Sequence, residues 1–336
     1  MKIGIFETLP GFGGGTNYQK YIIDALKSQH EINLFKLKSL ALLGTRPGKV
    51  LRATNVYHAH PEIDLWISSY LPTISMNITK PKGKVISLFF HLDDKGYPNP
   101  LISKLIRQLY YRQARYCDGV VTIAVYWRRF LEQNQIKVTD VIYWGFDTSK
   151  YEFSKEEVEA FKQKYSLQHK PVIYLGNCQP EKGVVEAYHQ LKYLDAHFIT
   201  SGEERVNIPA RNLILSYQEY CLLLRASDVV LTLSKFEEGW NATAHEAMLA
   251  GTPVIGSGLG GMAELLEGGG QSICNDLASL PELVSYALQN STELGERGRC
   301  FAAQFTLQRF AEAWQELVSR YEEPSLGKSG KRITIA

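Results

Sequence analysis

Short runs of apolar residues, many of them β-branched, alternate with longer stretches in which apolar and polar residues are mixed at helical spacing. The runs lie at 2–6, 29–35, 63–68, 84–90, 119–124 and 141–147, and again at 171–175, 196–202, 212–216, 228–233 and 254–255. Runs of this length are typical of strands buried on both faces of a parallel sheet. Their alternation with helices predicts an α/β protein with two Rossmann-like, doubly wound parallel sheets that face each other.

The chain is predicted to divide near its middle. Its 336 residues exceed the usual size of a single hydrophobic core, which predicts two domains. Residues 148–170 are polar and charged around a helical centre, so we expect one domain at 1–147 and a second at 148–305. An amphipathic helix is predicted at 306–323, and the Gly-, Ser- and Lys-rich residues 324–336 are expected to be mobile.

The stretch 227–264 carries the clearest local pattern. A buried strand is followed by a polar loop and by a helix that either Asn241 or Thr243 can cap. Gly251 suits a left-handed residue at the end of that helix, and Pro253 prevents its continuation before the next strand. These elements form a βαβ unit, whose loop lies at the carboxyl edge of a parallel sheet, where open α/β folds bind ligands.

Two carboxylates flank the start of this helix. Glu238 lies in the loop and Glu246 eight residues later. At ~1.5 Å of rise per residue they are on the order of 10 Å apart, too far to share a proton but suited to hold two ends of one ligand. Between them, backbone amides point out of the helix N-terminus, where phosphates bind. The residues of this phosphate site are Trp240, Asn241, Ala242 and Thr243. A nucleotide-sugar has this layout of sugar, diphosphate and ribose.

An isolated pair of acids near a helix end is more often solvated than part of a ligand site. The residues around Glu238 and Glu246 decide between these two roles. Glu238-x7-Glu246, followed by AMLAGTPVIGS and GGMAEL, resembles the signature of the retaining glycosyltransferases of family 4, which have the GT-B fold. The resemblance implies that Glu238 is catalytic and holds the donor sugar, and that Glu246 binds the ribose. It also implies that helix 306–323 crosses back to the first domain.

The same resemblance implies a reaction and its partners. A sugar would move, with retention, from a nucleotide-diphosphate donor to a glycan, lipid-linked or small-molecule acceptor, as in polysaccharide biosynthesis. No metal or other cofactor would be required. Asp93-Asp94 does not form the DxD pattern.

Three further positions are assigned by the resemblance. Gly14 and Gly15 would face the donor diphosphate, although a tight turn without a ligand also uses glycines. His91, just past a buried strand, would contact the donor sugar as a second catalytic residue, in preference to a structural hydrogen bond. Tyr217 is placed to stack on the base, although packing against Gln218 fits equally well.

The diphosphate clamp departs from the family pattern. Similar enzymes carry an Arg after the first Gly of the second domain and a Lys five residues on; here these positions are Asn177 and Lys182. An amide cannot supply the bidentate, charged contact that a guanidinium gives a phosphate. Either Lys182 and backbone amides suffice, or another cation enters, or donor binding is weak. The alternative function is therefore a non-catalytic nucleotide-sugar-binding GT-B protein.

Two other enzyme classes remain open. A glycine-rich loop after the first strand also suits an NAD-dependent oxidoreductase, with Glu31 in range of the ribose. However, Thr16 stands where the third glycine belongs, and nothing supplies a hydride-transfer site. A GT-B phosphorylase or epimerase would share the fold but would need no separate sugar acceptor.

Composition narrows the remaining classes. A net charge of +2 gives no global attraction to nucleic acid. Five scattered cysteines without a CxxC pair indicate a reduced, cytosolic protein without a metal site. The sequence begins directly with a predicted strand and shows neither a signal peptide nor an apolar run of ~18 residues, so we expect a cytoplasmic protein.

Three basic or histidine-containing segments have weaker interpretations. A helix at 101–116 mixes Lys and Arg with apolar residues; this pattern fits the inner face of a membrane, but a core-facing helix with a solvated basic side is favoured. Residues 36–55 are predicted to be a solvated connection rather than an acceptor-side loop. His58 and His60 would share one face of a strand, as structural or acceptor-side residues rather than metal ligands.

Overall fold

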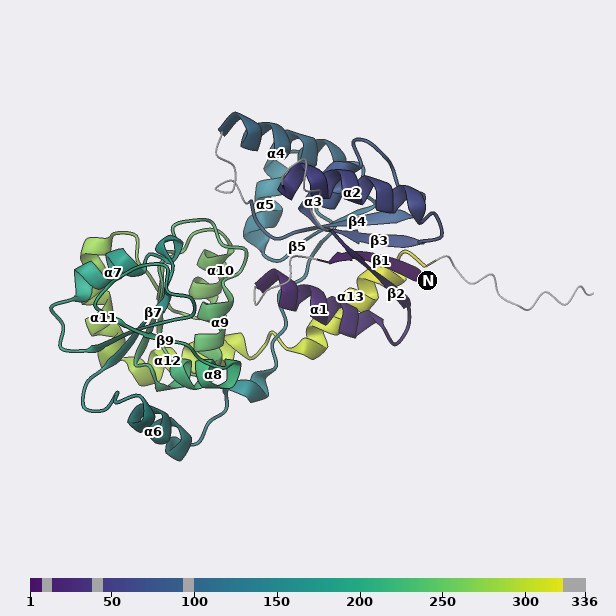
Figure 1. Ribbon diagram of the computed structural model, residues 1–336. Coiled ribbons are helices and arrows are strands. Elements are labelled where there is room, and N and C mark those ends of the chain that lie inside the picture. Colours follow the sequence, from purple (N-terminus) through teal and green to yellow (C-terminus); the bar gives the residue numbers. More distant parts are fainter. Residues whose placement is uncertain (8–13, 38–44, 93–99, 323–336) are drawn as a thin grey trace, which may run out of the picture.

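The computed structural model describes residues 1–7, 14–37, 45–92 and 100–322, which form two parallel sheets with helices on their faces (Figure 1). The strands are β1 (Lys2–Glu7), β2 (Glu31–Lys36), β3 (Leu65–Ser68), β4 (Lys84–Phe89), β5 (Gly119–Thr122), β6 (Asp140–Val141), β7 (Val172–Asn177), β8 (His197–Ser201), β9 (Arg211–Leu213), β10 (Val229–Thr232), β11 (Val254–Gly256) and β12 (Ser272–Ile273). The α-helices are α1 (Gly14–Leu26), α2 (Thr45–Ala59), α3 (Tyr70–Ser75), α4 (Pro100–Ala114), α5 (Val125–Gln133), α6 (Lys155–Lys164), α7 (Val184–Leu191), α8 (Tyr217–Ala226), α9 (Ala242–Leu249), α10 (Gly261–Gly268), α11 (Leu280–Gln289), α12 (Ser291–Ala302) and α13 (Leu307–Ser319). Short 3-10 helices are η2 (Thr148–Tyr151), η3 (Pro180–Lys182) and η4 (Leu277–Ser279).

Each sheet has six strands. The first has the order β2-β1-β3-β4-β5-β6, and the second has the order β12-β11-β10-β7-β8-β9. Every pair of neighbouring strands is parallel. Strands β3, β5 and β10 are buried along their whole length, which is why their sequences are nearly continuous apolar runs. The predicted α/β fold with two doubly wound parallel sheets is confirmed.

The segment after β2 differs from the prediction. The pattern at 36–55 predicts a solvated connection, but α2 begins within that range. Ala53 and Tyr57 are buried one helical turn apart, and the polar residues between them obscure this spacing. The expectation that His58 and His60 share a strand face is therefore wrong, because His58 lies on α2 and His60 follows its end.

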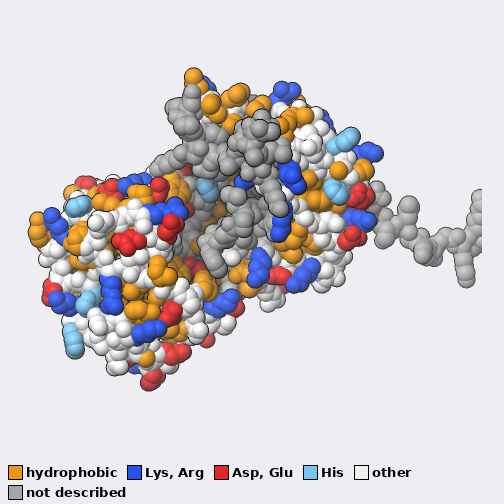
Figure 2. Space-filling view, in the orientation of Figure 1, with side chains coloured by type: hydrophobic (Ala, Val, Ile, Leu, Met, Phe, Trp, Pro, Cys, Tyr) orange, Lys and Arg blue, Asp and Glu red, His pale blue; other side chains and the backbone are white. Residues whose placement is uncertain are grey.

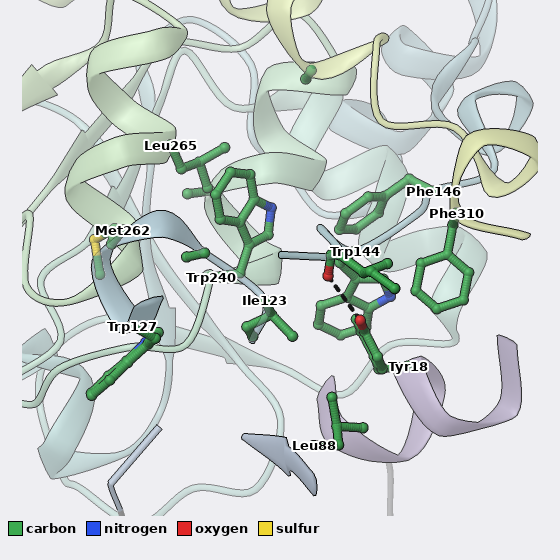
Figure 3. Close-up of a cluster of buried hydrophobic side chains, with 14 of the residues drawn as sticks. Tyr18, Leu88, Ile123, Trp127, Trp144, Phe146, Trp240, Met262, Leu265 and Phe310 are labelled. Atoms are coloured by element: carbon green, nitrogen blue, oxygen red, sulfur yellow. Dashed lines mark hydrogen bonds between the residues drawn. The ribbon is translucent and has the colours of Figure 1, made fainter. Parts of the chain in front are cut away.

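One cluster of buried side chains is shared by both halves of the chain (Figure 3). Ile123 and Trp127, at the end of β5 and in α5, belong to the same cluster as Met262 and Leu265 of α10. Trp240 joins it from the loop before α9. The two sheets are therefore held together by buried apolar surface rather than by a linker alone.

The chain returns to the first sheet at its end. In Figure 1, α13 (yellow) lies beside α1 (purple). The ring of Phe310 meets that of Tyr18 edge to face at 4.9 Å, and Gln315 Nε2 donates a hydrogen bond to the carbonyl of Ala25 at 2.8 Å. The hydroxyl of Tyr18 also donates to the carbonyl of Ile142 at 2.8 Å, the dashed contact in Figure 3. Helices α1 and α13 thus form one layer of the first half.

The expected domain limits at 147, 148 and 305 stay predictions; sheet membership changes between β6 and β7. The tail at 324–336 lies outside the described residues. Within the part of the chain that is described, no helix combines the length and apolar character needed to cross a bilayer.

Candidate active site

The loop between β10 and α9 turns sharply just before the helix. Asn241 has a positive φ of 66°, and its side chain accepts a hydrogen bond from the amide of Ala244 at 2.8 Å. Of the two predicted caps, Asn241 is therefore the residue used; its short polar side chain tolerates the left-handed conformation. The amides of Ala242 and Thr243 follow in the first turn, where an α-helix provides no carbonyl partner.

Glu238 is fixed through its backbone. Its carbonyl accepts hydrogen bonds from the amide of Gly261 at 2.9 Å and from Trp127 Nε1, in the other half, at 3.0 Å. A Cβ at Gly260 would lie 2.4 Å from that same carbonyl oxygen, and one at Gly261 would lie 2.0 Å from the carbonyl oxygen of Gly239. The two glycines of GGMAE are therefore needed for the close approach of α10 to the loop that carries Glu238.

The side chain of Glu238 forms an ion pair with Lys182. Lys182 Nζ lies 2.6 Å from Glu238 Oε1, and the hydroxyl of Ser234 donates to the same oxygen at 2.6 Å. The two side chains are 28% and 12% exposed, so water screens their attraction less than it screens a surface pair. The predicted sugar-binding acid and the predicted diphosphate-binding cation are thus in direct contact.

Lys182 reaches this position because the loop after β7 folds tightly. It ends η3, and Gly183 follows with a positive φ of 71°. A Cβ at Gly183 would lie 2.2 Å from the carbonyl oxygen of Leu233, which follows β10. Glycine therefore lets the two loops at the carboxyl edge of the second sheet meet.

The first half reaches the same loop through His91. This histidine follows β4 at the carboxyl edge of the first sheet. A Cβ at Gly239 would lie 3.7 Å from His91 Nδ1 and 3.1 Å from the carbonyl oxygen of Phe90. The ring of His91 lies 6.4 Å from that of Phe236. His91 and Glu238 therefore lie on segments of the two halves that are in contact.

Glu246 is buried on α9 among tyrosine hydroxyls. Those of Tyr151 and Tyr217 donate to its Oε1 at 3.0 and 2.9 Å, and that of Tyr220 donates to Oε2 at 3.2 Å. Burial raises the pKa of Glu246, and the hydrogen bonds from the three tyrosines lower it in part. The predicted ribose ligand is thus already hydrogen-bonded, and the half-exposed Tyr217 begins α8.

Asn177 is the last residue of β7. Its amide oxygen lies 3.3 Å from the hydroxyl of Ser201 and 3.4 Å from that of Tyr174. These two hydroxyls are themselves 2.7 Å apart. The amide oxygen of Asn177 is therefore turned toward β8, and its position at the strand end leaves it beside the carboxyl edge.

The other residues predicted to bind the donor differ in how far they are accessible to a ligand. Gly14 and Gly15 form the first turn of α1, and Gly11 and Gly13 lie outside the described residues. Trp240 is only 2% exposed, and its Nε1 donates to His245 Nδ1 at 3.1 Å. Only the backbone of Trp240 is therefore available to a ligand.

Glu31, the residue that an NAD-dependent oxidoreductase would need beside the ribose, lies at the wrong edge of the sheet. Glu31 is the first residue of β2 and pairs with Lys2 at the start of β1. It therefore lies at the amino edge of the sheet, whereas a dinucleotide binds at the carboxyl edge.

The sequence pattern alone did not identify Glu264 as a link between the two halves. Its Oε2 accepts hydrogen bonds from the amides of Val125 at 2.8 Å and Tyr126 at 3.3 Å, and the hydroxyl of Tyr143 donates to its Oε1. A carboxylate at a helix N-terminus satisfies amides that the helix leaves unpaired. The only sequence signal for Glu264 was its place in GGMAE. The groups that it binds come from a distant part of the chain and could not be read from that motif. Tyr151, Tyr220 and Ser234 were missed for the same reason.

The described ranges contain no group of three His, Cys, Asp or Glu side chains arranged to hold a metal ion. Whether a metal takes part is not tested by this finding, and metal independence stays a prediction.

Part of the second half matches a known protein family. Residues 169–290, which include Lys182, Glu238 and Glu246, match the family described as glycosyl transferases group 1. The 2-deoxystreptamine glucosyltransferase of Streptomyces kanamyceticus is 31% identical over 150 residues, which are 38% of this chain and 38% of that protein. The match thus spans well under half of this relative.

Solved structures resemble the whole chain. Anabaena HepE in complex with UDP aligns with a TM-score of 0.79 at 16% identity, covering 95% of this chain and 100% of HepE. Sucrose-phosphate synthase of Thermosynechococcus elongatus aligns with a TM-score of 0.77 at 15% identity, covering 95% of this chain and 98% of the synthase. Likeness at such identities shows the fold. The protein therefore has the GT-B fold, and the match to the glycosyl transferases group 1 family covers its residues 169–290.

Proposed function

We propose that this protein is a retaining glycosyltransferase of family 4, which moves a sugar from a nucleoside diphosphate to an acceptor hydroxyl. The observation that carries the proposal is the Lys182–Glu238 ion pair at the carboxyl edge of the second sheet, close to the start of α9. The proposed cation for a leaving diphosphate and the proposed carboxylate for a sugar are in contact within the matched residues, which supports the proposal.

Breaking the bond between the sugar and the diphosphate separates charge. Negative charge develops on the diphosphate, and Lys182 with the amides of Ala242 and Thr243 would stabilise it. Positive character develops on the sugar ring, which Glu238 would hold through its hydroxyls, with His91 on the side of the first half. Retention follows if the acceptor hydroxyl attacks from the face that the diphosphate leaves and passes its proton to the departing diphosphate, with no covalent intermediate on the protein.

Lys182 and Glu238 form an ion pair at 2.6 Å. A donor would take both partners at once, its phosphate replacing the carboxylate at Lys182 and its sugar hydroxyls replacing the ammonium at Glu238. Each charge keeps a partner, so neither is left buried and uncompensated.

A uridine diphosphate sugar is the first donor to test. HepE has been solved with UDP and with UDP-glucose, and this likeness supports the choice of base. Glu246 would then hold the ribose, with Tyr217 beside it. The acceptor is proposed to be a glycan, a lipid-linked sugar or a small molecule.

Donor binding can be tested before the acceptor is known. The melting temperature of the protein is measured with UDP-, GDP- and ADP-sugars, because a ligand of the native state raises it. We expect at least one of these donors to do so. Failure of every donor would refute the proposal.

Catalysis is then tested with Glu238→Gln against Glu267→Gln, an exposed acid on α10. We expect Glu238→Gln to lower transfer at least ~100-fold without loss of folding, since it removes a preorganised charge. The anomeric configuration of the product, read by NMR, tests retention. Transfer at the wild-type rate by Glu238→Gln would remove Glu238 from the mechanism.

A further inference from the structure

The outward face of α4 carries apolar side chains that the packing of the helix does not explain. Tyr110 and Ala114 are buried on its inner side. By contrast, Leu101, Ile102 and Leu105 are 75%, 46% and 59% exposed. A helix that only covers a sheet presents polar side chains to water. The sequence left two interpretations of this helix, and exposed leucines are not expected from a core-facing helix with a solvated basic side.

These residues form a stripe with a mixed chemistry. Leu101, Leu105 and Arg112 are spaced by four and seven residues, so they lie in line along one side of the helix. Lys104 and Ile102 flank that line, and Lys104 and Arg112 are exposed. We call these five residues the outward face of α4. Residues 100–117 contain four Lys or Arg and no Asp or Glu.

The neighbouring segment extends this character. Asn77 Nδ2 donates to the carbonyl of Leu109 at 3.2 Å, so the residues after α3 lie against α4. Lys80 Nζ lies 5.3 Å from the ring centre of Tyr116, and Tyr116 and Ile78 are both more than half exposed. Residues 77–84 add three lysines and no acid. The surface around α4 is therefore cationic and partly apolar.

The figures show the same arrangement. Figure 1 places α4 at the upper edge of the first half. Figure 2 shows hydrophobic side chains at that edge with Lys and Arg side chains beside them.

We propose that the outward face of α4 binds an anionic lipid surface. Leu101, Ile102 and Leu105 would enter the boundary between headgroups and acyl chains, and Lys104 and Arg112 would contact lipid phosphates. Helices that lie in a membrane surface combine these two kinds of side chain, and each cation near an anionic leaflet adds to the attraction. The charge of the face alone would suit either an anionic bilayer or an acidic protein. The exposed leucines also need an apolar environment, which favours the anionic bilayer.

The position of the helix connects this surface to the candidate active site. β4 leads to His91 at the carboxyl edge, and α4 begins soon afterwards at Pro100. A bilayer at α4 would bring a lipid-linked acceptor close to this edge. That last step rests on the proposed function, whereas surface binding does not.

The test measures sedimentation of the full chain with vesicles, in the absence of donor. Vesicles of phosphatidylcholine alone are compared with vesicles that contain about 30% phosphatidylglycerol, at low and at raised NaCl. The double variant Leu101→Ser/Leu105→Ser removes the apolar contact. Lys104→Gln/Arg112→Gln removes the charge. The matched control is Ile214→Ser, which changes a side chain that is 76% exposed in the second half.

We expect the wild type to bind anionic vesicles, less strongly in salt, and both double variants to lose at least ~10-fold in binding. Ile214→Ser should bind like the wild type. Absence of vesicle binding, or equal binding by Leu101→Ser/Leu105→Ser, would overturn the proposal. The proposal would also be overturned if the wild type formed a dimer without binding vesicles and Leu101→Ser/Leu105→Ser converted that dimer to a monomer. The face would then join two copies of the chain. The nucleotide-sugar melting shift, measured on the same variants, tests the donor site separately.

Discussion

The ammonium of Lys182 lies 2.6 Å from a carboxylate oxygen of Glu238, although the two residues come from different loops of the second sheet. One loop follows β7 and the other follows β10, and these strands are neighbours in the sheet. The contact therefore depends on the order of the strands as well as on the residues themselves. It also makes each residue the other's counter-ion, so changing one affects the other.

Lys182→Met is expected to lower kcat/KM for the donor by ~100-fold or more. The substitution removes the cation proposed to stabilise the leaving diphosphate, and a single preorganised donor of this kind contributes about that much. Steady-state kinetics with the donor identified by the melting-temperature panel measures it. Both kcat and donor affinity should fall, since the ammonium contacts phosphate before and during transfer.

The matched control is Lys164→Met. Lys164 pairs with Glu219 at 2.7 Å, but its side chain is 61% exposed on the outside of the second half. Exposed pairs contribute little, so this variant should retain wild-type kinetics and stability. If Lys182→Met also keeps wild-type kcat/KM, Lys182 has no part in the reaction.

The sequence was informative where chemistry is local. Asn241 and Gly251 could be assigned because a helix cap and a left-handed residue are read from a few adjacent positions, and both have positive φ. Tyr151 and Tyr220 beside Glu246 could not, because they come from η2 and α8 and meet it only in the folded chain. The helix around Ala53 was missed because its apolar stripe is narrow and interrupted by polar residues.

Tyr217→Phe is expected to tighten nucleotide binding several-fold. The hydroxyl of Tyr217 donates to Oε1 of Glu246, the residue proposed to hold the ribose, at 2.9 Å. A ligand that binds there must break this hydrogen bond, whose net contribution is typically about 0.5–1.5 kcal/mol. The phenylalanine ring keeps the apolar surface beside the base. Isothermal titration calorimetry with the nucleoside diphosphate measures the change.

Tyr220→Phe is the comparison for this prediction. Its hydroxyl donates to Glu246 Oε2 at 3.2 Å and also lies 3.2 Å from Thr243 Oγ1. We expect it to lower the free energy of unfolding by about 1 kcal/mol or more, because it leaves the buried carboxylate of Glu246 with one donor fewer. Weaker nucleotide binding by Tyr217→Phe would contradict the prediction and assign the hydroxyl to the ligand instead.

Asn177→Arg is expected to strengthen donor binding about tenfold. Asn177 ends β7 at the carboxyl edge, where the family pattern has an Arg. A guanidinium adds charge-assisted hydrogen bonds to phosphate that an amide does not supply. The affinity of the variant should also depend more steeply on NaCl concentration.

The variant Asn177→Ala is the control for Asn177→Arg. It removes the amide without adding a charge, so it separates these two effects on donor binding. The amide oxygen of Asn177 lies within 3.4 Å of the hydroxyls of Ser201 and Tyr174, and both substitutions remove those contacts. If Asn177→Arg and Asn177→Ala bind the donor equally, position 177 does not face the diphosphate. Calorimetry on both variants at two salt concentrations decides this.

His245 is expected to make the fold sensitive to acid. Its Nδ1 accepts from Trp240 Nε1 at 3.1 Å, and its Nε2 lies 3.1 Å from the carbonyl oxygen of Ala302. An indole can only donate and a carbonyl can only accept, so this geometry requires the neutral ring with its proton on Nε2. Burial accordingly lowers the pKa of His245 to about 3.

The direction of the pH effect follows from this lowered pKa. The unfolded chain takes up a proton near pH 6.5, whereas the folded chain resists it down to about pH 3. Stability from His245 is therefore complete above pH 6.5 and falls between these values, by up to ~1.4 kcal/mol per pH unit. Glu246 acts in the opposite sense, because its pKa is raised and acid favours its buried neutral form.

The variant His245→Gln isolates the histidine contribution. An amide can still accept from Trp240 and donate to Ala302, but it does not titrate. At pH 7.5 we expect the variant to be less stable, because the ring of His245 stacks on Phe146 at 3.9 Å. The gap in free energy of unfolding between wild type and variant should then narrow from pH 6.5 to 4.5, since only the wild type loses stability through this group. Glu246 is present in both proteins and cancels in the comparison. Urea titrations at several pH values measure the gap, and a gap that is independent of pH would mean that His245 does not remain neutral in the fold.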